Sequence, residues 1–330
     1  MSVSRPRFDY LDAERWSALG DVPVLVGDAV APDWPGGPVD AVRIGVDRAG
    51  ALPPVDPGQF DVLLTSADTA PAPWVSVKAD AFDREVARLE VAVRACPVAA
   101  TTLVRVLRMG EGMAADDALA LESLAYSTLL AGDEFRRWLA KRGEVAALTG
   151  GELKLEREGD CLAVTLASPA TRNAMTAAMR DALFEALANA LDDPSAPDVL
   201  VRAEGNCFST GGDLGEFGSA ADLATAHVVR SRRSVARLML ALGDRATVHF
   251  HRGAIGSGLE AFAGAARRTA SGDAWFQLPE LAMGLIPGAG GTVTVARAIG
   301  RHRAAWMMLT GQRVRARQAL DWGLVDEIVL

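Results

Sequence analysis

The sequence predicts an α/β protein built from repeated units of strand, glycine-rich turn and helix. Residues 198–205, DVLVRAEG, predict a buried strand that leads to one glycine-rich turn, and residues 246–250, ATVHF, predict a strand that leads to another. Residues 176–193 predict a helix whose first turn is capped by Thr176. Such units can form a doubly wound sheet or a stacked superhelix, and periodicity alone leaves both open.

The segments before these units divide the chain into three parts. Residues 1–77 contain three apolar, strand-like stretches separated by proline- and glycine-rich turns, so they predict a small accessory α/β segment. Residues 78–143 place apolar residues three or four positions apart, which predicts a helical region. Residues 144–330 form the predicted core, which opens with two alternating strands joined at Gly159-Asp160.

The composition is that of a globular protein rather than a membrane or nucleic-acid-binding one. Of the 330 residues 50% are hydrophobic, and the formal net charge of −8 argues against general affinity for nucleic acids. The three cysteines show no paired metal-ligand spacing, so neither a disulfide framework nor a zinc site is expected. Acidic residues occupy the place of a signal peptide's apolar stretch, and no run is long enough to cross a membrane. We therefore expect a cytoplasmic location.

Two glycine-rich turns and two glutamates suggest a catalytic site. Residues 206–214 read NCFSTGGDL and residues 253–260 read GAIGSGLE, and such turns bring backbone amides close to a ligand. Glu260 ends the second turn, and Glu280 follows in LPE. A third glycine-rich turn, PGAGGT at residues 287–292, opens a helix. Amide donors beside carboxylates suit an oxyanion site with acid/base chemistry next to it.

These motifs resemble those of the crotonase (enoyl-CoA hydratase/isomerase) superfamily. FSTGGDL is similar to its F-x-x-G-x-D turn, and GAIGSGLE is similar to its G-x-x-x-G-G-x-E segment. LPELAMGLIPGAGGT is close to its P-E-x-x-x-G-x-x-P-G-x-G-G-T signature, and the three occur in the family's order and spacing. The resemblance implies a crotonase-like ββα superhelix core rather than a doubly wound sheet.

The resemblance also assigns roles to individual residues. The backbone amides of Gly212 and Ser257 would bind the enolate oxygen of an acyl-CoA thioester, although Ser257 stands where most relatives have glycine. Glu260 and Glu280 would be the catalytic carboxylates, one activating water for attack at Cβ and the other exchanging a proton with Cα. Hydration or isomerisation of an enoyl-CoA is the reaction implied. Another enolate reaction (cofactor-free dioxygenation, decarboxylation or thioester hydrolysis) and a non-catalytic structural role remain open.

Coenzyme A would enter only as part of the substrate, with no further cofactor and no metal. Arg172 matches the family position near the nucleotide end of the thioester. Lys141 and Arg142 match the family's closing basic pair, which would reach the ligand of a neighbouring subunit. His249 and His251 are unusual, since relatives tend to have an apolar strand here, but no third metal ligand is evident and a structural or substrate-shaping role is favoured. The family usually forms trimers or dimers of trimers, so a homo-oligomer is expected.

The order of the segments departs from the family's pattern. Most crotonase-like enzymes carry a helical lid after the core, whereas here the stretches that look like that lid lie within residues 79–142 and precede the core. A circular permutation that moved the lid helices to the front would explain this order. An unrelated helical domain is the alternative, and some cofactor-independent dioxygenases of the superfamily carry a helical extension before the core.

Overall fold

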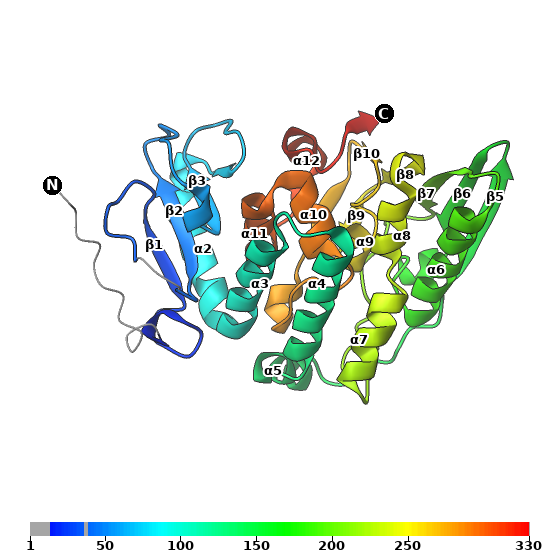
Figure 1. Ribbon diagram of the computed structural model, residues 1–330, viewed down its shortest axis with the longest axis horizontal. Helices are drawn as coiled ribbons and strands as arrows, with labels where there is room; N and C mark the ends of the chain where they lie inside the picture. Colours follow the sequence, from blue (N-terminus) through cyan, green and yellow to red (C-terminus); the bar gives the residue numbers. More distant parts are fainter. Residues whose placement is uncertain (1–13, 36–38, 330) are drawn as a thin grey trace.

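The computed structural model describes residues 14–35 and 39–329 (Figure 1). A parallel sheet lies at one end of the molecule, a group of helices lies in the middle, and the other two sheets lie beyond them toward the opposite end (Figure 1). None of the helices in the described part of the chain is long and apolar enough to cross a membrane.

The N-terminal sheet is parallel throughout and has the strand order β1-β2-β3-β4. Its strands are β1 (Val24–Asp28), β2 (Val42–Asp47), β3 (Val62–Thr65) and β4 (Trp74–Ser76). β2 and β3 are buried over almost their whole length, as expected for strands of a sheet covered on both faces. The three strands expected from the sequence are confirmed, and β4 was not predicted.

Four helices follow and carry the chain to the core. They are α2 (Phe82–Ala95), α3 (Pro97–Gly110), α4 (Ala115–Leu130) and α5 (Asp133–Arg142). α3 begins with proline, which lacks an N–H, and the carboxylate of Glu134 accepts hydrogen bonds at 2.9 Å from the amides of Val98 and Ala99. Glu134 belongs to α5, so these hydrogen bonds attach α5 to the beginning of α3.

The core contains two sheets, and consecutive strands such as β8 and β9 lie in different sheets. The six-stranded sheet has the order β13-β10-β8-β7-β6-β5 and is parallel except for β5; the three-stranded sheet has the order β12-β11-β9. The strands are β5 (Leu153–Glu158), β6 (Cys161–Leu166), β7 (Asp198–Ala203), β8 (Ala246–Phe250), β9 (Gly253–Ile255), β10 (Arg267–Ser271), β11 (Trp275–Gln277), β12 (Val314–Arg315) and β13 (Glu327–Val329).

Successive strands leave one sheet and enter the other before a helix begins. β8 belongs to the large sheet and β9, two residues later, to the small one; β10 and β11 repeat this pattern. The helices of the core are α6 (Ala177–Asp192), α7 (Leu223–Arg232), α8 (Val235–Leu242), α9 (Ser257–Glu260), α10 (Gly291–Ile299), α11 (Arg301–Thr310) and α12 (Ala316–Trp322). This is a ββα superhelix, and the fold class expected from the sequence motifs is confirmed.

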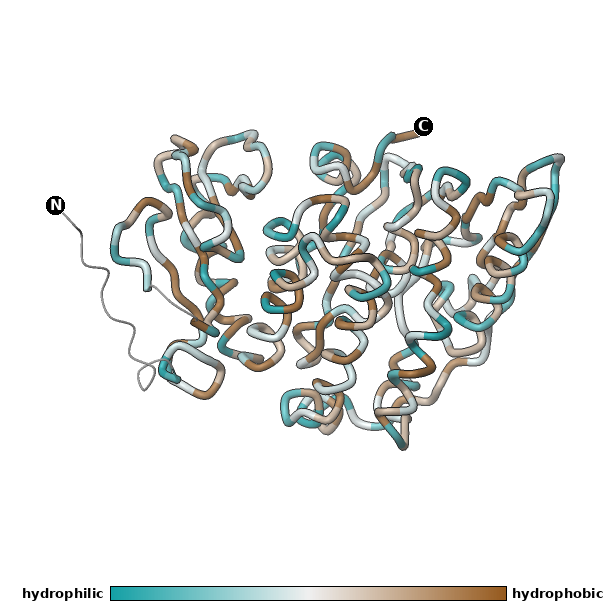
Figure 2. Tube along the Cα trace, viewed as in Figure 1, coloured by the Kyte–Doolittle hydropathy of each residue, from teal (hydrophilic) through white to brown (hydrophobic). Residues whose placement is uncertain are grey.

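One hydrophobic core joins the N-terminal sheet, the four helices and the ββα units. Its buried members extend from Val24 in β1 to Val325 before β13. Hydrophobic stretches follow the strands of the N-terminal sheet and the inner faces of the helices beside it (Figure 2). The accessory segment is therefore packed into the same body as the rest of the chain.

Buried cations at the start of α11 bind the N-terminal sheet. Arg303 donates to the carbonyls of Trp74 at 3.1 Å and Ala70 at 2.8 Å. Arg301 donates to the carbonyl of Phe60 at 2.7 Å, and both arginines are less than a tenth exposed. Because buried carbonyls without a donor are costly, these contacts attach the accessory segment to the core.

Replacing Arg303 with Met should therefore destabilise the protein. The variant leaves two carbonyls without their donor, so we expect the free energy of unfolding to fall by about 3 kcal/mol. Arg317→Met is the matched control, because the Arg317 side chain is 80% exposed and, among the residues that the structure describes, pairs only with Asp321, one turn away. Denaturant unfolding measures the free energy of unfolding of both variants. Equal stability of Arg303→Met and Arg317→Met would show that the contacts of Arg303 do not attach the accessory segment to the core.

Candidate active site

The turn after β9 and the residues after β11 lie side by side. β9 and β11 are parallel neighbours, so the chain leaves both strands at the same edge of the small sheet. Gly256 follows β9, and a Cβ added to it would lie 2.7 Å from Oε1 of Glu280. Gly256 also has a φ of +50°, which favours glycine. The pairing of two strands thus brings Glu280 to the turn that carries Ser257.

The other glycine-rich turn is joined to the same place by an isolated bridge. Ser209 pairs with Ala254: the amide of Ser209 donates to the carbonyl of Gly253, and the amide of Ile255 donates to that of Ser209, both at 3.1 Å. Gly211 consequently lies against the carbonyl of Ile255, where a Cβ would approach to 2.7 Å. The two turns predicted from the sequence are therefore in contact.

Two backbone amides at these turns have no protein partner. Within the described part of the chain, the amides of Gly212 and Ser257 donate no hydrogen bond to another protein group. Ser257 is the first residue of α9, where the N–H has no intrahelical acceptor. Both residues line the same cavity, and the Ser257 hydroxyl is also buried without a partner.

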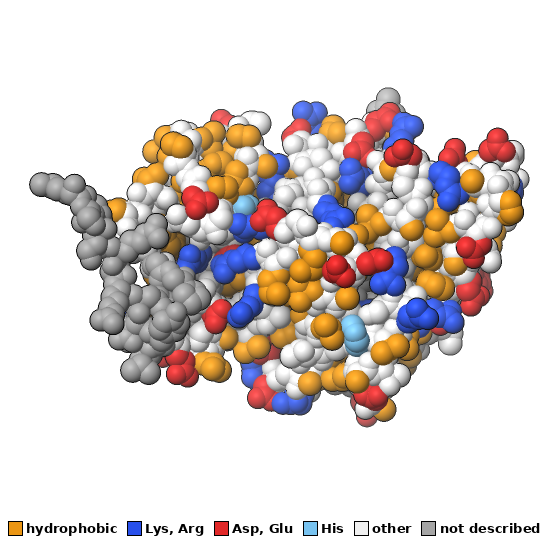
Figure 3. Space-filling view, in the orientation of Figure 1, with side chains coloured by type: hydrophobic (Ala, Val, Ile, Leu, Met, Phe, Trp, Pro, Cys, Tyr) orange, Lys and Arg blue, Asp and Glu red, His pale blue; other side chains and the backbone are white. Residues whose placement is uncertain are grey.

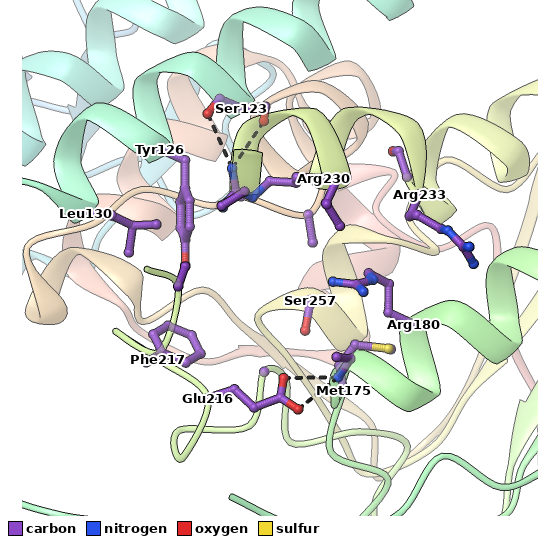
Figure 4. Close-up of a pocket in the computed structure, with 18 of the residues that line it drawn as sticks. Ser123, Tyr126, Leu130, Met175, Arg180, Glu216, Phe217, Arg230, Arg233 and Ser257 are labelled. Atoms are coloured by element: carbon purple, nitrogen blue, oxygen red, sulfur yellow. Dashed lines mark hydrogen bonds between the residues drawn. The ribbon is translucent and has the colours of Figure 1, made fainter. Parts of the chain in front are cut away.

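The cavity, shown in Figure 4, has a volume of about 1020 Å³. Glu260 and Glu280 also line it. Its walls include Tyr126 and Leu130 from α4 and Leu139 from α5, together with Met175 and Phe217 from the core. In Figure 4 the Tyr126 ring points from α4 into the open space, with Ser257 and Phe217 farther down. The four residues predicted for the chemistry thus share one cavity.

Glu260 is fixed by the turn that opens α10. Its Oε2 accepts hydrogen bonds from the amides of Ala289 at 2.7 Å and Gly291 at 3.1 Å, and the residue is only 2% exposed. A Cβ on Gly291 would lie 2.8 Å from Cγ of Glu260, so the carboxylate reaches these amides because glycine is there.

A third carboxylate, Glu122 of α4, binds the same turn. Its Oε1 accepts from the amide of Gly290 at 2.7 Å, and its Oε2 accepts from the amide and hydroxyl of Thr292 at 2.8 and 2.6 Å. Glu122 is 2% exposed. Successive amides at the beginning of one helix therefore alternate between two glutamates, one from the helical region and one from the core.

Glu280 is held differently. It begins the 3-10 helix η6 (Glu280–Met283) and is 8% exposed. Its Oε2 is buried and forms no hydrogen bond within the described part of the chain. A carboxylate buried without a donor is disfavoured in its charged form, and its free oxygen is available to a bound molecule.

The surroundings favour the protonated forms of all three glutamates. Burial, and then repulsion from Glu260, raises the pKa of Glu122 and of Glu280. Burial also raises the pKa of Glu260, against the opposing effect of the amides of Ala289 and Gly291. The carboxyl groups titrate as a coupled set, so the cluster holds protons at pH values where an exposed glutamate has lost its own. Such groups are suited to donate and accept protons near neutrality.

Other residues predicted for the site lie elsewhere. Arg172, Lys141 and Arg142 do not line this cavity, and Arg142 instead stacks on Trp138 and donates to the carbonyl of Leu214. Their assignment to coenzyme A stays a prediction.

The two unusual histidines also lie away from the cavity, and each has its own partner. His249 bonds the hydroxyl of Thr269, and His251 bonds the carbonyl of Gly205, both at 3.0 Å. Over residues 14–35 and 39–329 the structure contains no cluster of three or more side chains arranged to hold a metal ion.

Three further residues line the cavity, and no role was predicted for them from the sequence: Glu122, Tyr126 and Arg230. Glu122 and Tyr126 are four residues apart on α4, so they share one face of the helix. Glu122 could have been identified because it is a glutamate on the face of α4 that is otherwise mostly apolar and buried. Arg230 offered no such signal, because it lies among other arginines near the end of α7.

The geometry defines a class of site: unpartnered amides that can bind an oxyanion, next to carboxyl groups that can exchange protons. Comparison with known proteins gives the family. Residues 156–330 match the model of the enoyl-CoA hydratase/isomerase family. The chain belongs to this family.

The chain is also similar to individual proteins. The chain is 33% identical over 177 residues to the 2,3-dehydroadipyl-CoA hydratase of Escherichia coli (strain K12), covering 54% of this chain and 69% of that protein. It is also 33% identical over 167 residues to the peroxisomal bifunctional enzyme of Danio rerio, covering 50% of this chain and 22% of that one. The enoyl-CoA hydratase structure from Thermoplasma volcanium GSS1 is 29% identical, with a TM-score of 0.49 over 55% of this chain and 72% of that one.

The buried state of Glu280 predicts a pH-dependent stability. Its pKa in the folded protein lies above the ordinary value of 4.5, so above pH 4.5 the folded state binds more protons than the unfolded one and stability falls as pH rises. Glu280→Gln removes this effect. We expect the variant to gain stability relative to wild type between pH 5 and pH 8, by on the order of 1 kcal/mol.

Denaturant unfolding at several pH values measures the difference in stability between Glu280→Gln and wild type. Any cost of burying the glutamine amide is the same at every pH, so it does not affect how this difference changes with pH. Glu158→Gln is the control, because Glu158 is exposed at the end of β5. A difference between Glu280→Gln and wild type that does not change with pH would show that Glu280 is ionised throughout.

Proposed function

We propose that the protein hydrates an enoyl-CoA or moves its double bond, through an enolate bound by the amides of Gly212 and Ser257. The observation that supports this most directly is that two unpartnered amides share a cavity with Glu260 and Glu280. The thioester oxygen becomes negative in the enolate, and preorganised amide donors stabilise it most at that point. The name of the Escherichia coli relative, a hydratase, supports the same reading.

Hydration needs one carboxyl group as a base and one as an acid. The base takes a proton from water while the water oxygen bonds Cβ, and the electrons of the double bond move onto the thioester oxygen. The acid then gives its proton to Cα as the enolate collapses, so one water has been added. Raised pKa values keep part of the glutamate cluster protonated, so both forms are available together.

Isomerisation uses the same enolate but returns the proton to another carbon. One carboxyl group suffices if it reaches both carbons, and Glu280, with an oxygen that accepts no hydrogen bond, is the better candidate. Glu260 has less freedom because the amides at the start of α10 hold its Oε2. Glu122 has both oxygens engaged and acts as a positioning residue for that turn.

Replacing either glutamate should abolish most of the activity. Glu260→Gln and Glu280→Gln keep the shape of the side chain but cannot exchange the proton, so we expect turnover of a responsive 2-enoyl-CoA to fall by about 10²-fold or more. The assay follows loss of the conjugated thioester's absorbance together with product mass, over a panel of acyl chains. Glu158→Gln should retain wild-type turnover. Normal turnover in Glu260→Gln or Glu280→Gln would remove that residue from the mechanism.

A proline at position 257 would remove the amide of Ser257. Ser257 is the first residue of α9, a position where proline is well tolerated, and its N–H has no protein partner. Ser257→Pro should lower kcat by about 10²- to 10³-fold, the usual cost of losing one oxyanion donor. Ser257→Ala keeps the amide and should remain within a few-fold of wild type. Similar activity in both variants would contradict a role for this amide.

A further inference from the structure

Arg230 reaches from α7 across to α4 at the wall of the cavity. Its Nη1 donates to the hydroxyl of Ser127 at 3.0 Å and to that of Ser123 at 3.2 Å, and its guanidinium lies 4.5 Å from the centre of the Tyr126 ring. Figure 4 shows the side chain beside Tyr126, with Ser257 across the open space. These contacts fix the guanidinium in one place but supply no negative charge.

The other three arginines that line the cavity each have an acidic partner. Arg180 pairs with Asp181 at 2.8 Å, Arg233 with Glu185 at 3.4 Å, and Arg237 with Asp116 at 3.0 Å. Acidic and basic side chains are also interspersed over the molecular face in Figure 3. Among the cavity arginines Arg230 alone forms no ion pair with a carboxylate of the described residues.

Arg230 lies close enough to the glutamate cluster to interact with it electrostatically. It is half-buried, and burial lowers its pKa, while its charge acts on Glu122 and Glu260. Those two glutamates do not neutralise it at close range, because the α10 turn holds them. A partly desolvated guanidinium is stabilised by a carboxylate that arrives with the ligand, and its planar donors suit that group.

We propose that the acyl group of the substrate carries a carboxylate at its far end and that Arg230 binds it. This inference rests on the function proposed above, since the thioester is placed at Gly212 and Ser257. With the thioester there, the acyl chain extends into the cavity past Tyr126, and its terminal carboxylate meets the guanidinium. Arg230 is then a specificity-determining residue, while the carbons that react lie nearer to Glu260 and Glu280.

The kinetic test compares substrates of equal length with and without the terminal carboxylate. Hex-2-enedioyl-CoA and hex-2-enoyl-CoA, with the corresponding eight-carbon pair, are assayed with wild type, Arg230→Met and Arg233→Met. We expect wild type to prefer the dioic thioester by about tenfold or more in kcat/KM, as for a hydrogen-bonded charge pair. Arg230→Met should lose this preference through a lower rate with the dioic substrate. Arg233→Met should keep it, because Arg233 already has acidic partners.

A binding test separates this inference from the proposed reaction. Calorimetry measures the affinities for adipoyl-CoA, hexanoyl-CoA and free coenzyme A, none of which needs turnover. One outcome would contradict the proposed reaction and support the carboxylate site. In it, no enoyl-CoA reacts, wild type binds adipoyl-CoA more tightly than hexanoyl-CoA, and Arg230→Met loses this difference. Thermal unfolding of each variant verifies folding, and Arg230→Lys, which keeps the charge, should retain part of the preference.

Three results would overturn the inference. Equal or absent binding of adipoyl-CoA and hexanoyl-CoA by wild type would show that no carboxylate is recognised. An equal loss of affinity for all three ligands in Arg230→Met would place Arg230 at the coenzyme A phosphates. An equal fall in kcat for both substrates, with a shifted pH profile, would show that Arg230 instead tunes the glutamates.

Discussion

The amides at the beginning of α10 hold two buried glutamates that come from opposite halves of the chain. Ala289 and Gly291 donate to Glu260, and Gly290 and Thr292 donate to Glu122. A helix N-terminus favours nearby negative charge, but two carboxylates so close together repel one another. The turn therefore fixes the positions of both groups while their burial and repulsion keep protons on the cluster. The chemistry of the cavity depends on this arrangement.

The helices that precede the core complete the cavity. α4 lies beside α7 (Figure 1), and its residues Glu122 and Tyr126 line the cavity together with Glu260 and Glu280 of the core. α5 adds Leu139 to the same wall. This placement is what the permuted order of segments predicts for lid helices, and the permutation itself stays a prediction. Charged side chains reach the cavity both from the helices before the core, as Glu122 does, and from the core, as Arg230 does. Arg230 is held against α4 by its hydrogen bond to Ser127.

The sequence predicted best those site residues that lie in a turn directly after a strand. Gly212, Ser257, Glu260 and Glu280 could be predicted together because each follows a strand of a superhelix whose motifs have a characteristic spacing. Glu122 and the contacts of Arg303 could not, because they depend on how distant helices pack. No local pattern in the sequence encodes the register of α4 on α10.

The most direct test of the account is a crystal structure of the protein with a non-hydrolysable acyl-CoA in which the thioester sulfur is replaced by CH₂. The account predicts that the carbonyl oxygen accepts hydrogen bonds from the amides of Gly212 and Ser257, with Cα and Cβ between the carboxyl groups of Glu260 and Glu280. A carbonyl that contacts neither amide, or an acyl chain bound outside this cavity, would contradict it.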